Sequence, residues 1–268
     1  MNRRTLLASS LAASALAGAG PLGSLAGGEK RDPATREYYE LRLYHLRRGP
    51  QVKRMDDFMS QACAPALKRA GLGPLGAFDV TVGPSNPTLY LLMAYPSLDV
   101  FASLGVRLAE DAEFQKAGAD FLNATAADPA YVRVESALLA AFPGMPRLEV
   151  PPAAAEHRPR IFELRTYESH SKKADLKKIE MFDRGEIAIF RRTGLRPVFF
   201  GETLIGRNLP NLTYMVTFDD MEARQKNWAA FVADPDWKKL STTPGYTDVE
   251  TVSNITNVIL SPKPYSEI

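Results

Sequence analysis

The sequence predicts an α+β fold in which one β-α-β-β-α-β unit occurs twice. The chain of 268 residues is 45% hydrophobic and 24% charged, which is typical of a globular protein and leaves room for two domains of ordinary size. Some segments alternate polar and apolar residues as strands do, and others show helical spacing. In addition, the chain matches itself when it is shifted by 123 residues.

The internal match begins with a short motif and continues without a gap. Glu-Leu-Arg-x-Tyr occurs at residues 40–44 and again at 163–167. Because the repeats of solenoid proteins are about 20–50 residues long, a period of 123 residues indicates a duplicated domain. We expect a first domain, a Pro-rich extended linker and a second domain at residues 36–143, 144–159 and 160–262.

Each copy is expected to begin with a strand that is followed by a long helix. Residues 38–45 and 161–168 alternate with the period of two that strands show. The helical pattern that follows covers about residues 51–70 in the first copy and 172–193 in the second. Both helical segments end at a glycine, the residue type favoured just beyond a helix C-terminus.

Two strands joined by a turn come next in each copy. The turns are predicted at 83–87 and 206–211, where Gly, Pro, Asn and Ser are concentrated. Helical regions are expected to follow at about 98–122 and 221–240. In the second of them, Asp234-Pro235 has the pattern of an N-cap followed by proline at the first helical position.

A last strand completes each copy, near residues 131–142 and 249–260. This order is that of a ferredoxin-like unit, an antiparallel sheet with both helices on one face. The strand at 89–95 is apolar on both faces, so the face without helices must also be covered. We therefore expect the two sheets to close face to face, as a pseudo-dimeric α+β barrel.

These motifs give both halves a recognisable form. The repeated Glu-Leu-Arg-x-Tyr motif, the hairpin at 206–214 and the helix with Trp228 and Trp237 resemble the NIPSNAP domain of the dimeric α+β barrel superfamily. The first copy departs from this pattern, because Leu104 and Phe114 replace residues of the second copy, so we expect it to be the scaffolding half. The resemblance implies the fold more firmly than a reaction, since reported roles of the family include protein binding and vesicle or mitochondrial association.

The N-terminal segment at residues 1–28 is typical of an export signal. Arg3-Arg4 precedes a weakly apolar stretch rich in Ala, Leu and Ser, which resembles a twin-arginine (Tat) signal peptide. We expect cleavage between Ala17 and Ala26, a periplasmic or secreted location, and no stable membrane span afterwards. Cleavage also removes two arginines and no acidic residue, which takes the net charge from +2 to zero.

A neutral mature chain lacks the field that would neutralise phosphates, which argues against nucleic acid as a partner. We expect no cofactor and no metal, because no histidine pair has ligand spacing and no phosphate-binding loop, dinucleotide fingerprint or nucleophile elbow is present. Haem ligation by His170 is a minor alternative, which arises only because some relatives in the barrel superfamily bind haem. Cys63 is the only cysteine and is interpreted as a buried helical residue.

The first strand of each copy carries the candidate site residues. Alternation places Glu40, Arg42 and Tyr44 on one face of the strand, and the apolar residues between them on the other. The second copy repeats this set as Glu163, Arg165 and Tyr167. If the apolar face packs under the helices, both polar sets point into the space between the sheets.

Two interpretations of these residues remain open. They could form a pocket for an anion or a carbonyl group, with arginine as a bidentate donor and tyrosine as a proton donor. They could equally form an internal salt-bridge network, which satisfies charges that would otherwise be buried unpaired. The pocket interpretation predicts a protein that binds a small organic ligand or a protein partner through the barrel. Self-association of the chain is also possible under it. The competing hypothesis is a cofactor-independent oxygenase or isomerase.

Overall fold

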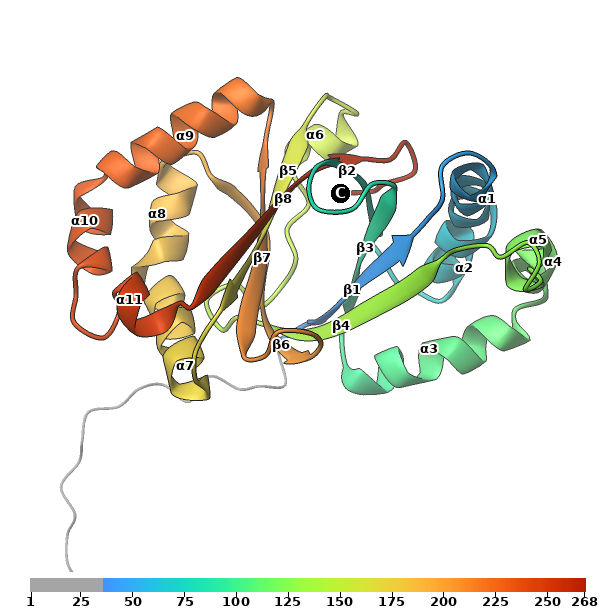
Figure 1. The fold of residues 1–268 in the computed structure, drawn as a ribbon, viewed down its shortest axis with the longest axis horizontal. Coiled ribbons are helices and arrows are strands. Elements are labelled where there is room, and N and C mark those ends of the chain that lie inside the picture. The colour runs from blue at the N-terminus through green and yellow to red at the C-terminus, as the bar shows by residue number, and fades with distance from the viewer. Residues whose placement is uncertain (1–35) are drawn as a thin grey trace, which may run out of the picture. The chain divides into compact units, whose positions relative to one another are not determined.

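The computed structural model describes residues 36–268, so the expected export signal at 1–28 lies outside the described residues. Each copy contributes four strands (Figure 1). The strands of the first copy are β1 (Tyr38–His45), β2 (Gly76–Val82), β3 (Thr88–Tyr95) and β4 (Arg133–Ala141). Those of the second copy are β5 (Ile161–Glu168), β6 (Arg196–Ile205), β7 (Asn211–Phe218) and β8 (Asn254–Pro262).

Most helices occupy corresponding positions in the two copies, and α5 and α11 are the exceptions. The first copy has α1 (Pro50–Phe58), the π-helical segment η2 (Met59–Cys63), α2 (Ala64–Arg69), α3 (Leu98–Glu110), α4 (Ala112–Ala117) and α5 (Ala119–Leu122). The short helix α6 (Pro152–Ala155) lies between the copies. The second copy has α7 (Lys172–Met181), the π-helical segment η3 (Phe182–Glu186), α8 (Ile187–Arg192), α9 (Met221–Ala233), α10 (Pro235–Ser241) and α11 (Asp248–Thr251).

All eight strands of the described chain form one closed barrel in the order β1-β3-β2-β8-β5-β7-β6-β4, with antiparallel pairing throughout. The two copies meet at two seams, where β2 pairs with β8 and β4 pairs with β6. Closure removes the free sheet edges that two separate sheets would expose. The predicted α+β barrel is therefore confirmed, with the two sheets joined by hydrogen bonds at both seams.

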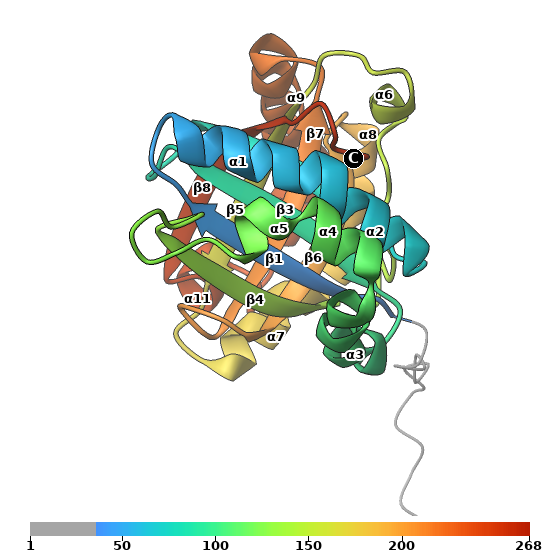
Figure 2. The ribbon, with the colours of Figure 1, turned by 90° about the vertical axis from the view of Figure 1, so that its right-hand side faces the viewer.

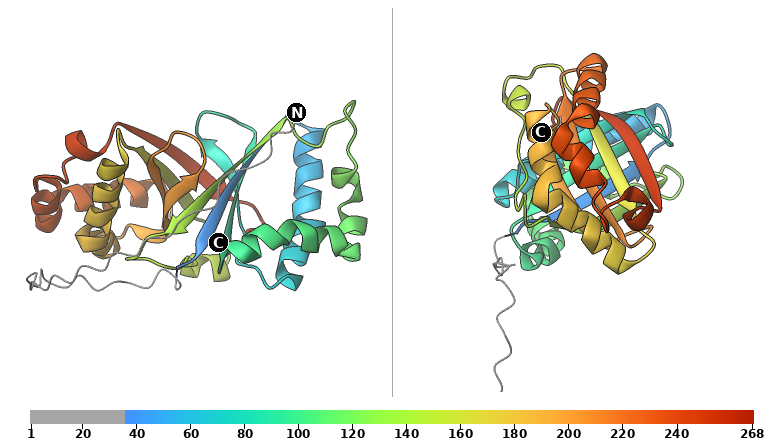
Figure 3. Two further views of the ribbon diagram at one scale, coloured as in Figure 1. Left: turned by 90° about the horizontal axis from the view of Figure 1, so that it is seen from below. Right: turned by 90° about the vertical axis from the view of Figure 1, so that its left-hand side faces the viewer.

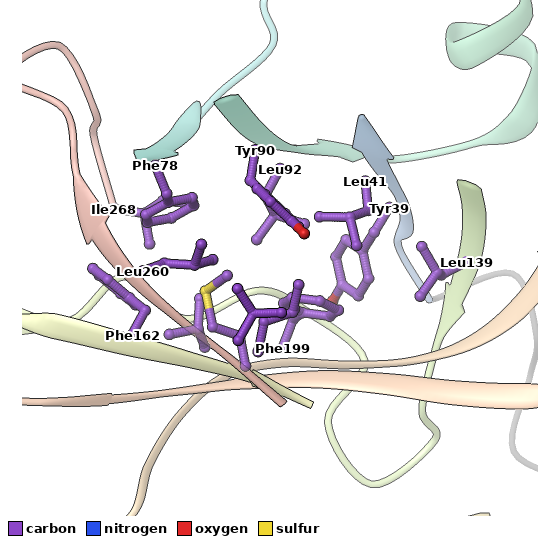
Figure 4. Packing of buried hydrophobic residues seen from close by; sticks show 14 of the residues in the cluster. Tyr39, Leu41, Phe78, Tyr90, Leu92, Leu139, Phe162, Phe199, Leu260 and Ile268 are labelled. Atoms are coloured by element: carbon purple, nitrogen blue, oxygen red, sulfur yellow. The ribbon is translucent and has the colours of Figure 1, made fainter. Parts of the chain in front are cut away.

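The barrel interior is filled by apolar side chains from both copies. Figure 4 shows Phe78, Leu92 and Leu41 of the first copy in the same cluster as Phe162 and Leu260 of the second. These side chains are at most 8% exposed. An eight-stranded barrel is just wide enough for side chains to fill it, and the space between the sheets is mostly solid core.

Helices cover the outside of the barrel on both sides (Figure 3, left). In Figure 2, α1 and α2 lie across β3 and β1, and an apolar cluster that includes Met59, Phe58 and Leu91 fills the layer between them. In the second copy, Phe182, Phe190 and other aromatic side chains fill the corresponding layer beneath α7–α9. The second copy therefore has a strongly aromatic outer core.

The element boundaries agree closely with the sequence for the first strand and first helix of each copy. Asp234 caps α10, accepting hydrogen bonds from the backbone N–H groups of Asp236 and Trp237, as predicted. Two expectations differ in detail. The linker is not extended throughout, because α6 interrupts it. The last strand of the second copy begins at Asn254, because α11 occupies residues that were expected to start the strand.

The predicted orientation of the first strands is wrong. Tyr39 and Leu41 point into the barrel, whereas Glu40, Arg42 and Tyr44 point towards the helices. The reason is that the barrel interior is mostly apolar core, in which a buried charge would lack a partner, which is costly. Beneath the helices, the same charges reach partners on neighbouring elements. No helix in the described part of the chain is long and apolar enough to cross a membrane.

Candidate functional site

In the second copy, the carboxylate of Glu163 is the centre of a saturated hydrogen-bond network. It is fully buried and accepts hydrogen bonds from Arg224 at 2.7 and 2.8 Å. It also accepts from the Trp228 indole at 2.7 Å, from Asn257 at 2.6 Å and from Arg165 at 3.0 Å. Burial raises the pKa of Glu163, but the bonds from Arg224 and Trp228 outweigh it, so the pKa is below its usual range.

Arg165 lies between Glu163 and the aromatic rings of the helix layer. Its guanidinium carbon is 4.9 Å from the centre of the Trp228 ring and 5.4 Å from that of Tyr167. The side chain is 17% exposed, because Trp228 covers it from α9. Cation–π contacts of this kind are stronger when they are shielded from water. In this copy, the internal salt-bridge interpretation describes Glu163 well, whereas the buried Nε of Arg165 has no hydrogen-bond partner among the described residues.

The first copy has the same ion pair with fewer partners. Arg42 donates from Nε to Glu40 Oε1 at 2.8 Å, and its Nη2 atom lies 2.7 Å from the same oxygen. Ser136 and Tyr95 donate to the same carboxylate at 2.6 and 3.0 Å. Arg42 also donates to the Tyr44 hydroxyl, over a long 3.4 Å. An arginine has five N–H groups, so this geometry leaves donor capacity on Nη1 and Nη2.

The two arginines differ most in how much solvent reaches them. Arg42 is 34% exposed, twice the value for Arg165. The helices α3 and α9 have equal lengths and equivalent positions, and the residue of α3 that corresponds to Trp228 is Gly105. A Cβ atom added at Gly105 would meet no other atom within 4 Å. The ring that covers the arginine in the second copy therefore has no counterpart in the first.

Each copy interrupts its long helix with a π-helical segment at the same place. Such segments occur often at functional sites. In the first copy η2 ends at Cys63, and in the second η3 ends at Glu186, so two different side chains occupy equivalent positions beside the arginines. Cys63, expected to be buried, is half-buried, and desolvation raises the pKa of its thiol to about 11, which disfavours the thiolate form.

Glu186 is a fully buried carboxyl whose Oε2 atom has no hydrogen-bond partner among the described residues. Burial raises its pKa to about 7, although Lys178 Nζ lies 3.7 Å away. The closer partner of Lys178 is Asp248, at 3.1 Å. A carboxyl that titrates near neutral pH can donate or accept a proton, which is the property that acid–base catalysis needs.

Tyrosine hydroxyls lie in the same layer. The hydroxyl groups of Tyr167 and Tyr214 are 3.1 Å apart, and both are buried. Burial raises the pKa of each of them, so both remain protonated at neutral pH. The second copy therefore holds a carboxyl, an ammonium group and a pair of phenols within one enclosed region.

The histidines form no metal site in the described part of the chain, where no group of three His, Cys, Asp or Glu could hold a metal ion. His45 lies 3.0 Å from Glu135 and 3.3 Å from the Thr88 hydroxyl. His170 is exposed to solvent, which does not fit an enclosed haem ligand.

The structure brings each predicted set together within its own copy, and never across the barrel. Sequence reasoning missed Glu186, Lys178 and Arg224, which join the second set from the helices. The signal for Glu186 was weak but visible, because the 123-residue offset pairs it with Cys63. A cysteine and a glutamate at equivalent positions of a duplicated domain mark a difference in function or environment.

The fold and these clusters define a class of protein, a closed eight-stranded α+β barrel with helices outside and a polar cluster beneath the helices of each copy. The chain belongs to the NIPSNAP family, whose model matches residues 39–143 and 162–267. The family resemblance seen in the sequence is confirmed for both copies. No curated protein matches the chain.

Several solved structures are similar to this chain. An uncharacterized NIPSNAP-like domain protein from Burkholderia xenovorans is 26% identical, with 41% of this chain and 90% of that one covered and a TM-score of 0.37. A provisionally assigned monooxygenase from Lactobacillus acidophilus is 7% identical, with 85% and 94% covered and a TM-score of 0.55. Another, from Fusobacterium nucleatum, is 9% identical, with 85% and 93% covered and a TM-score of 0.53. At 7–9% identity these two show a shared fold and nothing more.

Proposed function

We propose that the chain binds a small organic ligand that carries an anionic or carbonyl oxygen, at the Arg42 cluster of the first copy. The observation that carries this proposal is the partial exposure of Arg42, 34%, next to the position where Gly105 replaces a covering tryptophan. A guanidinium with spare donors, a phenol and an approach from solvent are the elements of an oxyanion-binding site. Glu40, Arg42 and Tyr44 are the proposed ligand-binding residues.

The second set, Glu163, Arg165 and Tyr167, has a different proposed role. Every acceptor position of Glu163 is used by an internal donor, and Trp228 covers Arg165. We therefore assign this set to stability, and the first copy, which the sequence suggested as the scaffold, to binding. Duplication supports such a division, because one copy can keep the fold while the other changes.

Two alanine variants test this division, with benzoate as the probe ligand. Arg42→Ala is expected to weaken benzoate binding at least tenfold, as loss of a charge-assisted hydrogen bond does. Arg165→Ala is expected to lower the thermal midpoint and leave benzoate affinity unchanged. Isothermal titration and thermal unfolding of both variants measure the two effects separately.

A third variant reproduces the cover of the second copy in the first. Gly105→Trp adds a ring where the space is free, and it is expected to abolish benzoate binding without loss of stability. The proposal fails if benzoate binds equally well to wild type, Arg42→Ala and Gly105→Trp. Loss of affinity in Arg165→Ala would show that the second copy is the binding half.

A second candidate function is a cofactor-independent oxygenase or isomerase that uses Glu186. The buried Glu186 carboxyl favours this candidate. Burial raises its pKa to about 7, and the carboxyl lies beside the Tyr167–Tyr214 hydroxyl pair. The provisional assignment of two fold relatives as monooxygenases is compatible with it. Oxygen uptake with a panel of phenols, compared between wild type and Glu186→Gln, tests it. Turnover that survives unchanged in Glu186→Gln counts against this candidate.

We also propose that each copy is a ferredoxin-like unit and that the barrel is a pseudo-dimer of the two. The strand orders β4-β1-β3-β2 and β8-β5-β7-β6 support this, because they are the same order within each copy. Export through a Tat-like signal at 1–28, to the periplasm or beyond, is proposed from the sequence alone. Mass spectrometry of the mature N-terminus tests the export proposal.

A further inference from the structure

Side chains fill one end of the barrel interior, and a cavity lies towards the other end. At one end Ile268 packs fully buried among Phe78 and Phe162, and Arg160 donates to its backbone oxygen at 2.6 Å. Towards the other end lies a cavity of ≈ 170 Å³, which we call the barrel mouth. A cavity of roughly 150 Å³ is large enough to take up a benzene ring, so the barrel mouth has room for a molecule of that size.

The two copies line the barrel mouth with different chemistry. The first copy contributes a mostly apolar wall, made by Leu41, Leu43, Ala137 and Leu139, together with Glu135 and Ser136. The second copy contributes a hydroxyl wall, made by Thr166, Thr203 and Thr213. None of the residues that were predicted as site residues lines this cavity, because they lie on the other face of the strands.

The hydroxyl wall arises where the internal symmetry of the barrel is broken. By the 123-residue offset, Thr166, Thr203 and Thr213 correspond to Leu43, Val80 and Tyr90 of the first copy, in that order. Thr203 and Thr213 are 6% and 3% exposed. Thr213 is much smaller than its counterpart Tyr90, whereas Thr203 has the shape of its counterpart Val80 and differs by a buried hydroxyl. A core selected only for stability gains from filling such a space and loses by burying hydroxyls.

The three threonine hydroxyls can still accept hydrogen bonds from a bound molecule. Thr166 and Thr213 share a single bond of 2.9 Å, and Thr203 donates to Asn211 at 2.6 Å. Each threonine hydroxyl can donate once and accept twice, so acceptor positions remain open in all three. The wall can therefore take a donor from a bound molecule without breaking its own bonds.

The two charged side chains that line the barrel mouth, Glu135 and Arg207, pair with each other. Glu135 pairs with Arg207 at 2.8 Å, with Arg133 at 3.0 Å and with His45 at 3.0 Å. The long Arg207 side chain is 76% exposed and remains in solvent. A buried ion needs a partner of opposite charge, and the polar groups of the lining other than this pair are uncharged hydroxyls and the amides of Asn208 and Asn211. The lining therefore favours an uncharged occupant.

We propose that the barrel mouth is a second binding site, which takes a small neutral molecule with a hydroxyl edge and an apolar face. The hydroxyl edge lies against Thr166 and Thr213, and the apolar face against Leu41 and Leu43. A cyclic alcohol or a phenol has this chemistry. This site differs from the Arg42 site in the charge of its ligand and in the side of the sheet on which it lies.

Cyclohexanol and phenol are the probes for this proposal, titrated against the full chain and followed by ligand-observed NMR. Thr213→Val keeps the shape and removes one hydroxyl, and it is expected to weaken binding about fivefold, the effect of one net hydrogen bond. Ala137→Leu extends a side chain of the cavity lining into the space and is expected to abolish binding. If Ala137→Leu fails to fold, Thr213→Val decides the question.

Two control variants locate the binding. Thr217→Val makes the same change four residues further along β7, where the hydroxyl donates to the backbone oxygen of Ile161, and it should leave affinity unchanged. Arg42→Ala should also leave it unchanged, so failure of the Arg42 site and failure of the barrel mouth give different results. Absence of saturable binding, or equal affinity in wild type, Thr213→Val and Ala137→Leu, overturns the proposal.

Discussion

At the scale of single residues, the number of partners separates two arginine–glutamate pairs that look identical in the sequence. Glu163 receives donors from four different side chains, and its copy closes over it with Trp228. Glu40 has three such partners and no covering ring. The motif predicts the pair, whereas the other partners come from elements distant in sequence, α9 and β8 for Glu163 and β3 and β4 for Glu40, so the motif alone could not tell a closed network from an open site.

Glu186 supplies a prediction about the pH dependence of stability. Burial raises its pKa from the ordinary value of 4.5 to about 7, so the folded chain holds this proton more tightly than the unfolded chain. Its stabilising effect is complete below the unfolded pKa and is lost as pH rises towards 7, by up to about 3 kcal/mol. Glu186→Gln removes this loss, because its amide does not ionise.

The measurement is urea unfolding of wild type and Glu186→Gln at about pH 5 and about pH 8. The variant is expected to gain stability relative to wild type at the higher pH. Lys178, Asp248 and Arg165 also act on the Glu186 carboxyl, and they are the same in both proteins, so the difference isolates Glu186. A difference in unfolding free energy that does not change between the two pH values contradicts the raised pKa.

At the scale of elements, the sequence predicted the strands and helices well but assigned the faces of the first strands wrongly. Local signals such as alternation at 38–45 and the Asp234-Pro235 cap are sufficient to define an element. Which face of the strand points into the barrel depends on which side of the sheet is more apolar and less accessible to water. The closed barrel places one face of the strand in a mostly apolar core, and nothing local to Tyr39 or Glu40 indicates that closure.

The start of α10 gives a prediction for one element. Asp234 caps this helix and also pairs with Arg192 at 2.6 and 2.9 Å, just as Asp111 caps α4 and pairs with Arg69. Asp234→Ala is expected to lower the thermal midpoint more than Asp234→Asn, because asparagine still caps a helix while it loses the ion pair. Differential scanning calorimetry of the two variants checks the order.

The acid range provides the control for this prediction. Bonds from Arg192 lower the pKa of Asp234 to about 2, so its ion pair contributes stability above the ordinary aspartate pKa and loses it as pH falls towards 2. The difference between wild type and Asp234→Asn should shrink over that window. Equal midpoints for Asp234→Ala and Asp234→Asn would mean that the cap contributes nothing.

At the scale of the whole molecule, the duplication made the barrel predictable, but it gave no indication that the two copies line the barrel interior differently. The 123-residue offset and the doubly apolar strands were sufficient to predict that two sheets cover each other. The barrel mouth could not be predicted in the same way, because a threonine in a strand is ordinary by itself. Thr213 becomes unusual only when closure places it in the barrel opposite the apolar wall of the other copy.

Both tryptophans of the chain, Trp228 and Trp237, lie in the second copy, which allows a direct test that the two copies share one barrel. Leu92→Ala removes a fully buried side chain that the first copy places in the barrel interior. Unfolding in urea is followed by tryptophan fluorescence and by far-UV circular dichroism. We expect both signals to show one coincident transition, destabilised by about 2–5 kcal/mol. A fluorescence midpoint that stays at the wild-type value while the dichroism midpoint falls would mean that the copies are separate domains.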